Sequence, residues 1–326
     1  MMKAVQLTRE STSEAPKMST TTLPIPQLQP GHALVRIHYT SIQPSDRLNA
    51  QGLFPYTTFP RIPGRDYSGT VIDIEGDSKE TRSWIGKEVY GTSGSSLGFD
   101  LDGTHAQYCL IPQSALVEKP VALSAIQAAV VGVPFTTALI CLQRAQVKEE
   151  NTVLVLGANG AVGSAVTQMA RAIGCKQVLT AARGGKPDVM LGSHASLKQQ
   201  ISALTGGKGV DVVIDTVGDL SLMSESLEEL AVKGRYAWIT APRECASKEL
   251  TFDVFQAYRK EISLLGCNSV ARTLEETAGY LRSMHNWVDQ GLLKSLDETT
   301  FEIVKLNDAV EAGYGGASQK VVIDMS

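Results

Sequence analysis

The pattern of hydrophobic and polar positions divides the chain into two kinds of sequence. In the first third, short alternating runs are separated by turn residues, and they predict strands at 32–39, 69–74 and 87–90. The Ser/Thr-rich segment 11–22 predicts a loose hairpin or an exposed loop. We therefore expect a compact, mostly β unit at the start of the chain.

From about residue 122 the pattern changes to helix, and then to strands and helices in alternation. The apolar runs predict strands at 152–156, 177–181, 210–216, 236–240 and 262–265. Such alternation is typical of a parallel, doubly wound sheet, so the predicted fold class is α/β. Short strands return at 301–304 and 320–323, and we expect them to rejoin the N-terminal unit.

The predicted domain organisation follows from these changes in the pattern of hydrophobic and polar residues. Residues 1–121 are expected to form the β-rich unit, residues 122–268 the doubly wound unit, and residues 269–326 the return to the first.

The segment 121–142 has no charged residue and reaches membrane-spanning length. Because Pro134 and several polar residues interrupt it, two buried helices meeting near Pro134 are predicted instead.

A glycine-rich turn follows the apolar run 153–156, and a helical pattern follows the turn at once. Apolar residues then recur at three- and four-residue spacing up to Gly174, namely Val162, Val166, Met169, Ala170 and Ile173. A strand, a glycine turn and a helix in this order begin a dinucleotide-binding βαβ unit, in which the first N–H groups of the helix face a pyrophosphate.

The candidate phosphate-binding residues are Gly157, Ala158, Asn159, Gly160, Ala161, Val162 and Gly163. Gly160 lets the backbone approach the phosphates, Gly163 lets helix and strand pack closely, and Ala158 takes the place of the first glycine of G-x-G-x-x-G. A simple tight turn is the alternative. The strand before it and the helix and strand after it favour dinucleotide binding.

The end of the next strand bears on the identity of the cofactor. NAD-preferring proteins usually place an acidic residue about twenty residues past the glycines. This chain has Arg183 there, with Lys186 close behind. A guanidinium can form two charge-assisted hydrogen bonds to a 2′-phosphate, so the sequence favours NADPH. The alternative is that Arg183 is an ordinary solvated loop residue.

Composition and charge bound the remaining possibilities. The 326 residues are 43% hydrophobic and 20% charged, as in soluble globular proteins. A net charge of -4 gives no overall attraction to nucleic acid or to an anionic membrane, and the N-terminus lacks the apolar core of a signal peptide. The cysteines are far apart and predict free thiols in a reducing cytoplasm: Cys109, Cys141, Cys175, Cys245 and Cys267.

Several motifs in a fixed order carry a family resemblance. They are S-I-Q-P-S-D at 41–46, I-P-G-R-D-Y-S-G at 62–69, G-T-H-A-Q-Y at 103–108, the glycine turn, and G-V-D-V-V-I-D-T-V-G at 209–218. Together they resemble the medium-chain dehydrogenase/reductase superfamily, and more closely its quinone oxidoreductase and enoyl reductase branch. The resemblance covers nearly the whole chain. It implies a GroES-like catalytic domain, a Rossmann domain, a cleft between them and commonly a homodimer.

The zinc ligands of the superfamily's alcohol dehydrogenases have no counterparts in this sequence. Those enzymes place a Cys in a G-x-C-x-x-D turn and a His-Glu pair in a G-H-E segment, whereas this chain has Gln43 in the first and Arg65-Asp66 in the second. An arginine at a ligand position would repel the cation. The four closely spaced cysteines of a structural zinc lobe are also missing. A zinc-independent protein with no bound metal is therefore predicted.

Two side chains are candidate catalytic groups. Gln43 stands where related quinone reductases carry an Asn, and its amide could donate a hydrogen bond to a substrate carbonyl. Mitochondrial-type enoyl reductases have a Tyr in a Q-G-N-Y-G segment that resembles a proton donor; here Phe54 takes that place, and Tyr56 follows two residues later. Tyr56 is a candidate acid, with packing as the alternative. Asp46 is expected to cap or pin the local turn.

The resemblance and the strand ends extend the cofactor site. Thr137 matches a threonine near the nicotinamide in the family, and the further candidates are Thr216, Val217, Gly218, Gly266, Cys267 and Asn268. The last three could line the nicotinamide end or a dimer edge. The segment after Arg183 is shorter than in relatives, as if a helix were shortened or lost, which predicts a more open adenosine pocket.

The sequence thus predicts an NADPH-dependent, zinc-independent reductase. Its small-molecule substrate would be a quinone or an enone, with hydride transferred to the quinone or to the conjugated C=C of an α,β-unsaturated carbonyl. A dedicated enoyl reductase of lipid or secondary metabolism is one alternative. A non-catalytic NADPH-binding protein, structural or regulatory, is another, because a fold and a cofactor site do not prove turnover.

Overall fold

A computed structural model describes residues 1–12, 14–242, 247–315 and 320–326, so Cys245 lies outside the described residues. The chain forms two compact units, Met1–Val133 with Val270–Ser326 and Pro134–Ser269. The first boundary between these compact units falls at Val133/Pro134, inside a helix that starts at Ala125, whereas the sequence analysis divided the chain at 121/122. Each unit is described by itself.

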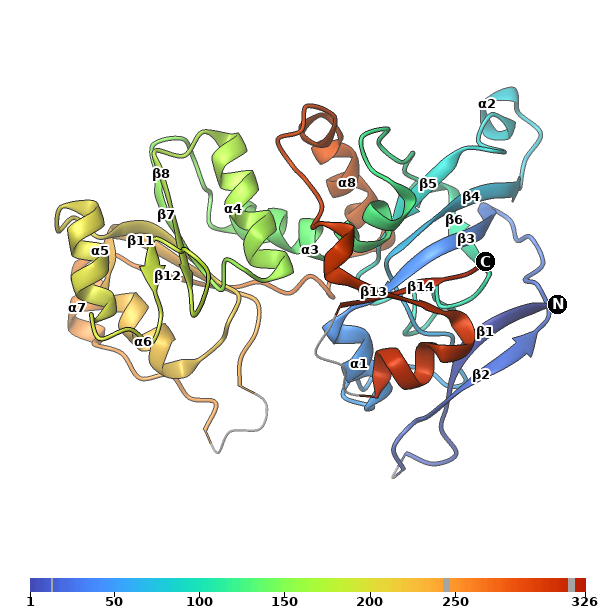
Figure 1. Cartoon of the computed structure of the whole chain (residues 1–326), viewed down its shortest axis with the longest axis horizontal. Helices are drawn as coiled ribbons and strands as arrows, with labels where there is room; N and C mark the ends of the chain where they lie inside the picture. Colours follow the sequence, from blue (N-terminus) through green and yellow to red (C-terminus); the bar gives the residue numbers. More distant parts are fainter. Residues whose placement is uncertain (13, 243–246, 316–319) are drawn as a thin grey trace. The chain divides into compact units, whose positions relative to one another are not determined.

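The first unit is built mainly from antiparallel strands (Figure 1). A two-stranded sheet joins β1 (Met2–Thr8) to β2 (Lys17–Leu23). Of the two alternatives predicted for 11–22, the hairpin agrees with the structure for residues 17–22, which lie in β2 and pair with β1 in antiparallel fashion.

The larger sheet of this unit has the order β13-β14-β3-β4-β5, with β6 also paired to β3. Its strands are β3 (His32–Ile42), β4 (Tyr67–Ile74), β5 (Glu88–Gly91), β6 (Tyr108–Pro112), β13 (Phe301–Lys305) and β14 (Lys320–Asp324). The helices and single turns are α1 (Pro44–Ala50), α2 (Lys79–Arg82), α8 (Leu274–Asp289), η1 (Gln113–Ala115), η2 (Glu298–Thr300), η3 (Leu306–Asp308) and η4 (Val310–Tyr314). The C-terminal strand β14 pairs with β3, so the tail rejoins the N-terminal unit as the sequence predicted.

The second unit contains a parallel sheet of order β12-β11-β10-β7-β8-β9 (Figure 1). Its elements are β7 (Thr152–Leu156), α4 (Ala161–Ile173), β8 (Gln177–Ala182), β9 (Val189–Met190), α5 (Leu197–Thr205), β10 (Val210–Asp215), α6 (Leu220–Glu228), β11 (Leu230–Trp238), α7 (Val254–Arg259) and β12 (Ser263–Gly266). All five residues of β7 are buried, as in a strand with both sheet faces covered. This arrangement confirms the predicted α/β class with a doubly wound parallel sheet.

A single helix, α3 (Ala125–Arg144), replaces the two helices predicted around Pro134. Proline removes one helical N–H, and the preceding Val133 N–H donates to the Asp66 carboxylate, at 3.0 Å from Oδ1 and 3.1 Å from Oδ2. The carboxylate therefore supports the interrupted turn. The most apolar window of α3 is 78% buried, as in the core helix of a soluble protein.

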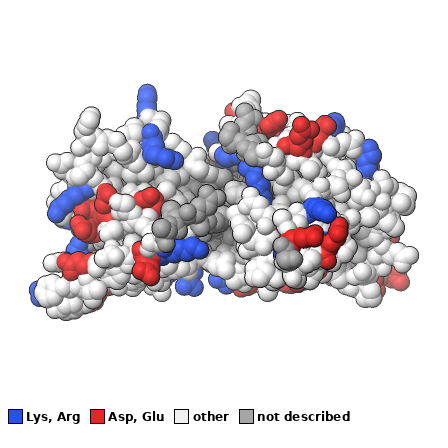
Figure 2. Space-filling model, turned by 90° about the horizontal axis from the view of Figure 1, so that it is seen from below, with Lys and Arg blue, Asp and Glu red and all other residues white. Residues whose placement is uncertain are grey.

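Charges of both signs are interspersed on the face shown in Figure 2. Patches of Lys and Arg lie beside patches of Asp and Glu, which fits a net charge of only -4. A single-sign field of the kind that attracts nucleic acid is not seen among the described residues of this face.

Candidate functional site

A cavity of about 650 Å³ lies at the carboxyl ends of the central strands of the second unit. Gly157 and Asn159 follow β7, Arg183 follows β8, and Val217 follows β10; all four line the cavity, together with Gly160. Open parallel sheets bind ligands at this edge. Five of the predicted cofactor residues therefore share one concave wall.

The glycine turn is shaped by close backbone contacts. Gly157 has φ +79°, a conformation that favours glycine, and a Cβ on Gly163 would lie 2.2 Å from the Gly157 carbonyl oxygen. Helix α4 starts at Ala161 with Gly160 as its N-cap, and no side chain caps it. The N-cap residue Gly160 lines the cavity, so the cavity meets α4 at an end that no side chain caps. Ala158, Ala161, Val162 and Gly163 shape this turn and are not on the cavity wall.

The segment after Arg183 contains no helix before β9. Arg183 is exposed and lines the cavity, whereas Lys186 is exposed and does not. Most of the residues from 190, in β9, to 197, at the start of α5, also line the cavity. The chain therefore passes from β8 to β9 through a loop without a helix.

The turn after β10 is held by a carboxylate that the sequence analysis missed. Asp215 Oδ1 accepts hydrogen bonds from the Val217 N–H at 2.7 Å and the Gly218 N–H at 3.1 Å, and the Tyr236 hydroxyl donates to Oδ2 at 3.0 Å. Burial raises the pKa of Asp215 from its usual value, and these hydrogen bonds oppose the rise. Thr216 is also fixed, because its hydroxyl donates to the Leu156 carbonyl at 2.8 Å.

Thr137 lies on α3 with only 4% of its surface exposed, and its hydroxyl has no hydrogen-bond partner among the described residues. Such orphaned buried groups are uncommon and call for an explanation. At the end of β12, Gly266 precedes the buried Cys267 and then Asn268; none of the three lines the 650 Å³ cavity. A hydrogen bond to the Cys267 thiol, together with burial, holds the pKa of Cys141 well above its usual range.

In the first unit, Gln43 precedes α1 and is nearly buried. Its Nε2 donates to Ser41 Oγ at 3.0 Å and to Asp66 Oδ2 at 2.8 Å, so both amide hydrogens have acceptors. The Gln43 backbone N–H donates to Asp46 Oδ2 at 2.8 Å, which is the capping role expected for Asp46. A substrate carbonyl would have to replace one of the two acceptors of the Gln43 amide.

Arg65 and Asp66 occupy the interior of the same unit. Arg65 Nε lies 3.6 Å from Asp46 Oδ1, and its guanidinium also donates to Ser45 Oγ and to the Ser93 carbonyl. Burial raises the pKa of Asp66 to about 6, against the opposing effects of the Arg65 charge and the Val133 N–H. Among the residues that the structure describes, no three His, Cys, Asp or Glu side chains form a metal-binding group.

Tyr56 is 42% exposed and belongs to an aromatic cluster. Its ring centroid lies 5.6 Å from that of Phe54 and 5.4 Å from that of Phe99. Partial burial raises the pKa of Tyr56, and the Arg65 charge opposes the rise. These contacts give the ring a packing role and leave part of it accessible.

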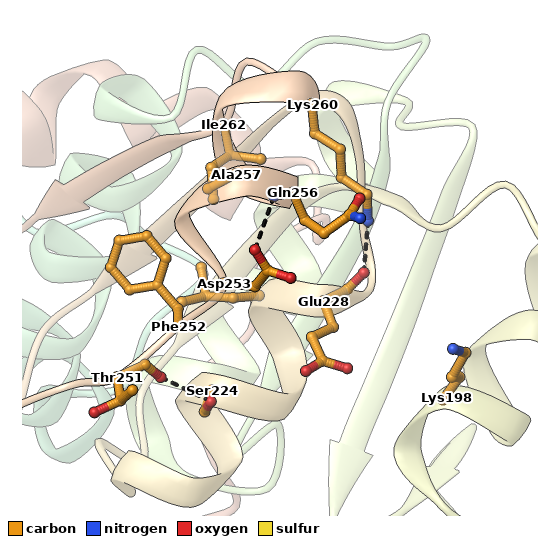
Figure 3. A pocket seen from close by; sticks show the side chains of 11 residues that line it. Lys198, Ser224, Glu228, Thr251, Phe252, Asp253, Gln256, Ala257, Lys260 and Ile262 are labelled. Atoms are coloured by element: carbon orange, nitrogen blue, oxygen red, sulfur yellow. Dashed lines mark hydrogen bonds between the residues drawn. The ribbon is translucent and has the colours of Figure 1, made fainter.

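A second cavity of about 620 Å³, which the sequence analysis did not predict, lies beside α6 and α7 (Figure 3). Some of its polar groups pair with one another: the Gln256 N–H donates to Asp253 Oδ1 at 3.0 Å, and Lys260 Nζ donates to the Glu228 carbonyl at 2.7 Å. The glycine turn does not line it. We therefore take the 650 Å³ cavity as the candidate site.

Comparison with known proteins places the chain in a family. Residues 29–121 match the alcohol dehydrogenase GroES-like domain, and residues 161–285 match the zinc-binding dehydrogenase family. A zinc-type alcohol dehydrogenase-like protein of Schizosaccharomyces pombe is 43% identical over 100% of this chain and 98% of its own length. A quinone oxidoreductase of Pongo abelii is 28% identical over 99% of this chain and 98% of its own length.

Solved structures agree with this assignment. An alcohol dehydrogenase superfamily protein from Novosphingobium aromaticivorans has a TM-score of 0.82, with 26% sequence identity and complete coverage of both chains. The chain belongs to the medium-chain dehydrogenase/reductase superfamily, in its quinone oxidoreductase-like branch. It is accordingly an oxidoreductase of that family, and the resemblance predicted from the motifs is confirmed.

Proposed function

We propose that this protein is an NADPH-dependent, zinc-independent reductase that transfers hydride to a quinone or to the conjugated C=C of an α,β-unsaturated carbonyl. The observation that carries the proposal is the position of Arg183 on the wall of the cavity at the glycine turn. A cation there suits a 2′-phosphate. The similarity to a quinone oxidoreductase supports the choice of substrate class.

The residues present fit a dinucleotide. The glycine turn leaves no room for side chains at Gly157 and Gly163. The buried Thr137 hydroxyl has no hydrogen-bond partner among the described residues, so it is available to a polar group of the ligand. The backbone at Gly157, Asn159 and Gly160 would hold the pyrophosphate, and Arg183, with Lys186 nearby, would bind the 2′-phosphate. Bound NADPH would supply the hydride.

In the first unit, Gln43 would donate a hydrogen bond to the substrate oxygen, and Tyr56 is the candidate proton donor. The negative charge that follows hydride addition to an enone or a quinone is delocalised, so neutral donors can stabilise it. In the alkoxide formed from a simple ketone, the negative charge is localised on one oxygen atom. For this reason we propose conjugated acceptors as substrates.

Zinc should be absent from the active protein. Gln43 and Arg65 stand where zinc-dependent relatives have ligands. The Arg65 guanidinium donates a hydrogen bond to Ser45 and forms an ion pair with Asp46. We expect elemental analysis of the purified protein to find no stoichiometric zinc, and exhaustive chelation to leave activity unchanged. One zinc per chain, with activity lost on its removal, would refute zinc independence.

We also propose a homodimer that forms along β12. This strand is at the end of the sheet order, and the neighbouring helix α7 exposes 67% of Val254, 57% of Phe255 and 62% of Tyr258. Sedimentation equilibrium should give the mass of two chains, and Phe255→Glu should shift the protein toward one. Ile85→Glu, at an exposed apolar residue of the other unit, is the control. A wild-type monomer would rule the dimer out.

The proposed compartment is the cytoplasm. Cys109, Cys141, Cys175 and Cys267 are all free thiols, which suits a reducing environment.

A further inference from the structure

Side chains from outside the loop that bears Arg183 hold it in place: Thr180 contacts its middle at Asp188, and Asn159 and Gln200 contact its two ends. Residues 183–196 run from the end of β8 to the start of α5 and include only the two-residue strand β9. Many of these residues line the 650 Å³ cavity. Because a loop of this length has little regular structure, its shape depends on the contacts that brace it.

Asn159 braces the beginning of the loop. Its Nδ2 donates to the Gly184 carbonyl at 2.8 Å, directly after Arg183 in the chain. The next residue, Gly185, has φ +79°, so the chain turns sharply there. One side chain of the phosphate-binding turn therefore fixes the backbone that carries the cation.

Gln200 braces the end of the loop. On α5, its Oε1 accepts from the Met190 N–H at 2.8 Å, and its Nε2 lies 3.0 Å from the Ala195 carbonyl, 3.1 Å from the Met190 carbonyl and 3.2 Å from Ser193 Oγ. All three contacted residues line the cavity. They bring no charged side chain to it, so this part of the wall has no counter-ion for a 2′-phosphate.

We propose that Asn159 and Gln200 are positioning residues with separate tasks in cofactor recognition. Asn159 sets the preference for NADPH over NADH by placing Arg183. Gln200 sets the affinity that the two cofactors share by shaping the adenosine side of the cavity. The inference rests on the proposed function, because it requires this cavity to bind NADPH. Its physical basis is preorganisation: a braced loop loses less entropy when the ligand binds.

Direct binding of NADPH and NADH to the full chain tests the proposal without a substrate. We expect Asn159→Ala to weaken NADPH by about 3- to 10-fold, the effect of one neutral hydrogen bond, and to leave NADH unchanged. Gln200→Ala should weaken both cofactors by the same factor. In the Arg183→Ala background, Asn159→Ala should have no further effect, since the two residues act as one unit. Gln177→Ala, which removes an amide of the same unit that donates to the Leu204 carbonyl and does not line the cavity, is the matched control.

The outcomes separate the inference from the proposed function. If Arg183→Ala weakens NADPH selectively but Asn159→Ala weakens both cofactors equally or neither, the task assigned to Asn159 is refuted. A selective loss of NADPH, or no loss, in Gln200→Ala refutes the task assigned to Gln200. If Arg183→Ala is itself unselective, the proposed cofactor preference fails. Circular dichroism checks the fold of each variant, and Asn159→Ser, which also removes the amide, must reproduce Asn159→Ala.

Discussion

Replacing Gly163 by valine is expected to weaken NADPH binding by more than about 100-fold. A Cβ at this position would lie 2.2 Å from the Gly157 carbonyl oxygen and 2.9 Å from Ala158 Cα. These atoms belong to the backbone, so no side chain can move aside, and the start of α4 must separate from the glycine turn. Equilibrium titration of cofactor fluorescence measures the loss.

Gly279→Val, on the exposed face of α8 in the first unit, is the matched control for this substitution. A Cβ on Gly279 would meet no atom within 4 Å, and Gly279 does not line the cavity. The control should therefore bind NADPH nearly as well as the wild type. If Gly163→Val, folded by circular dichroism, bound NADPH with wild-type affinity, the glycine turn could not be the pyrophosphate site.

Arg183→Ala is expected to weaken NADPH by about 10- to 150-fold, which corresponds to roughly 1.5–3 kcal/mol for hydrogen bonds to a charged group. The affinity for NADH should stay the same, because the ribose of NADH has a hydroxyl in place of the phosphate. Titrating each cofactor against both proteins measures the difference. Lys208→Ala, which removes an exposed cation that does not line the cavity, controls for net charge.

If Arg183→Ala lost the same affinity for NADPH and for NADH, Arg183 would be an ordinary solvated loop residue and not a ligand of the 2′-phosphate. Raising the salt concentration adds a further check, since a charge-assisted contact at an exposed residue is partly screened. The advantage of NADPH over NADH should then fall in the wild type and change little in the variant.

The parts of the fold that the sequence predicted well depend on local signals. The strand expected at 152–156 is β7 (Thr152–Leu156), and α4 ends before Gly174 as predicted, because an apolar run, a glycine turn and a helical periodicity stand next to each other. The same local motifs were enough to identify the family.

Features set by distant contacts could not be predicted. Helix α3 continues through Pro134 beside Asp66, which is 67 residues away from Val133 in the sequence. The strand expected at 236–240 begins at Leu230, with an irregular register against β10 that periodicity does not reveal.

The same limit applies to the candidate site. The sequence analysis proposed the Gln43 amide as a donor to a substrate carbonyl. Its acceptors in the structure, Ser41 and Asp66, could not be identified from the sequence because the fold brings them together. Asp215 lies within the motif at 209–218, but its role was missed because it binds backbone N–H groups and not a ligand. Gln200 was missed because it also holds backbone groups and matches no motif. A buried carboxylate at a strand end was the one available signal for Asp215.

The most direct test of the whole account is to give the enzyme matched enones, quinones and saturated ketones with NADPH, and to follow both cofactor oxidation and product identity. We expect the conjugated acceptors to be reduced and the saturated ketones to be left almost untouched. No turnover of any compound, with tight NADPH binding intact, would support the non-catalytic alternative. Preferential reduction of the saturated ketones to alcohols would contradict the proposed chemistry.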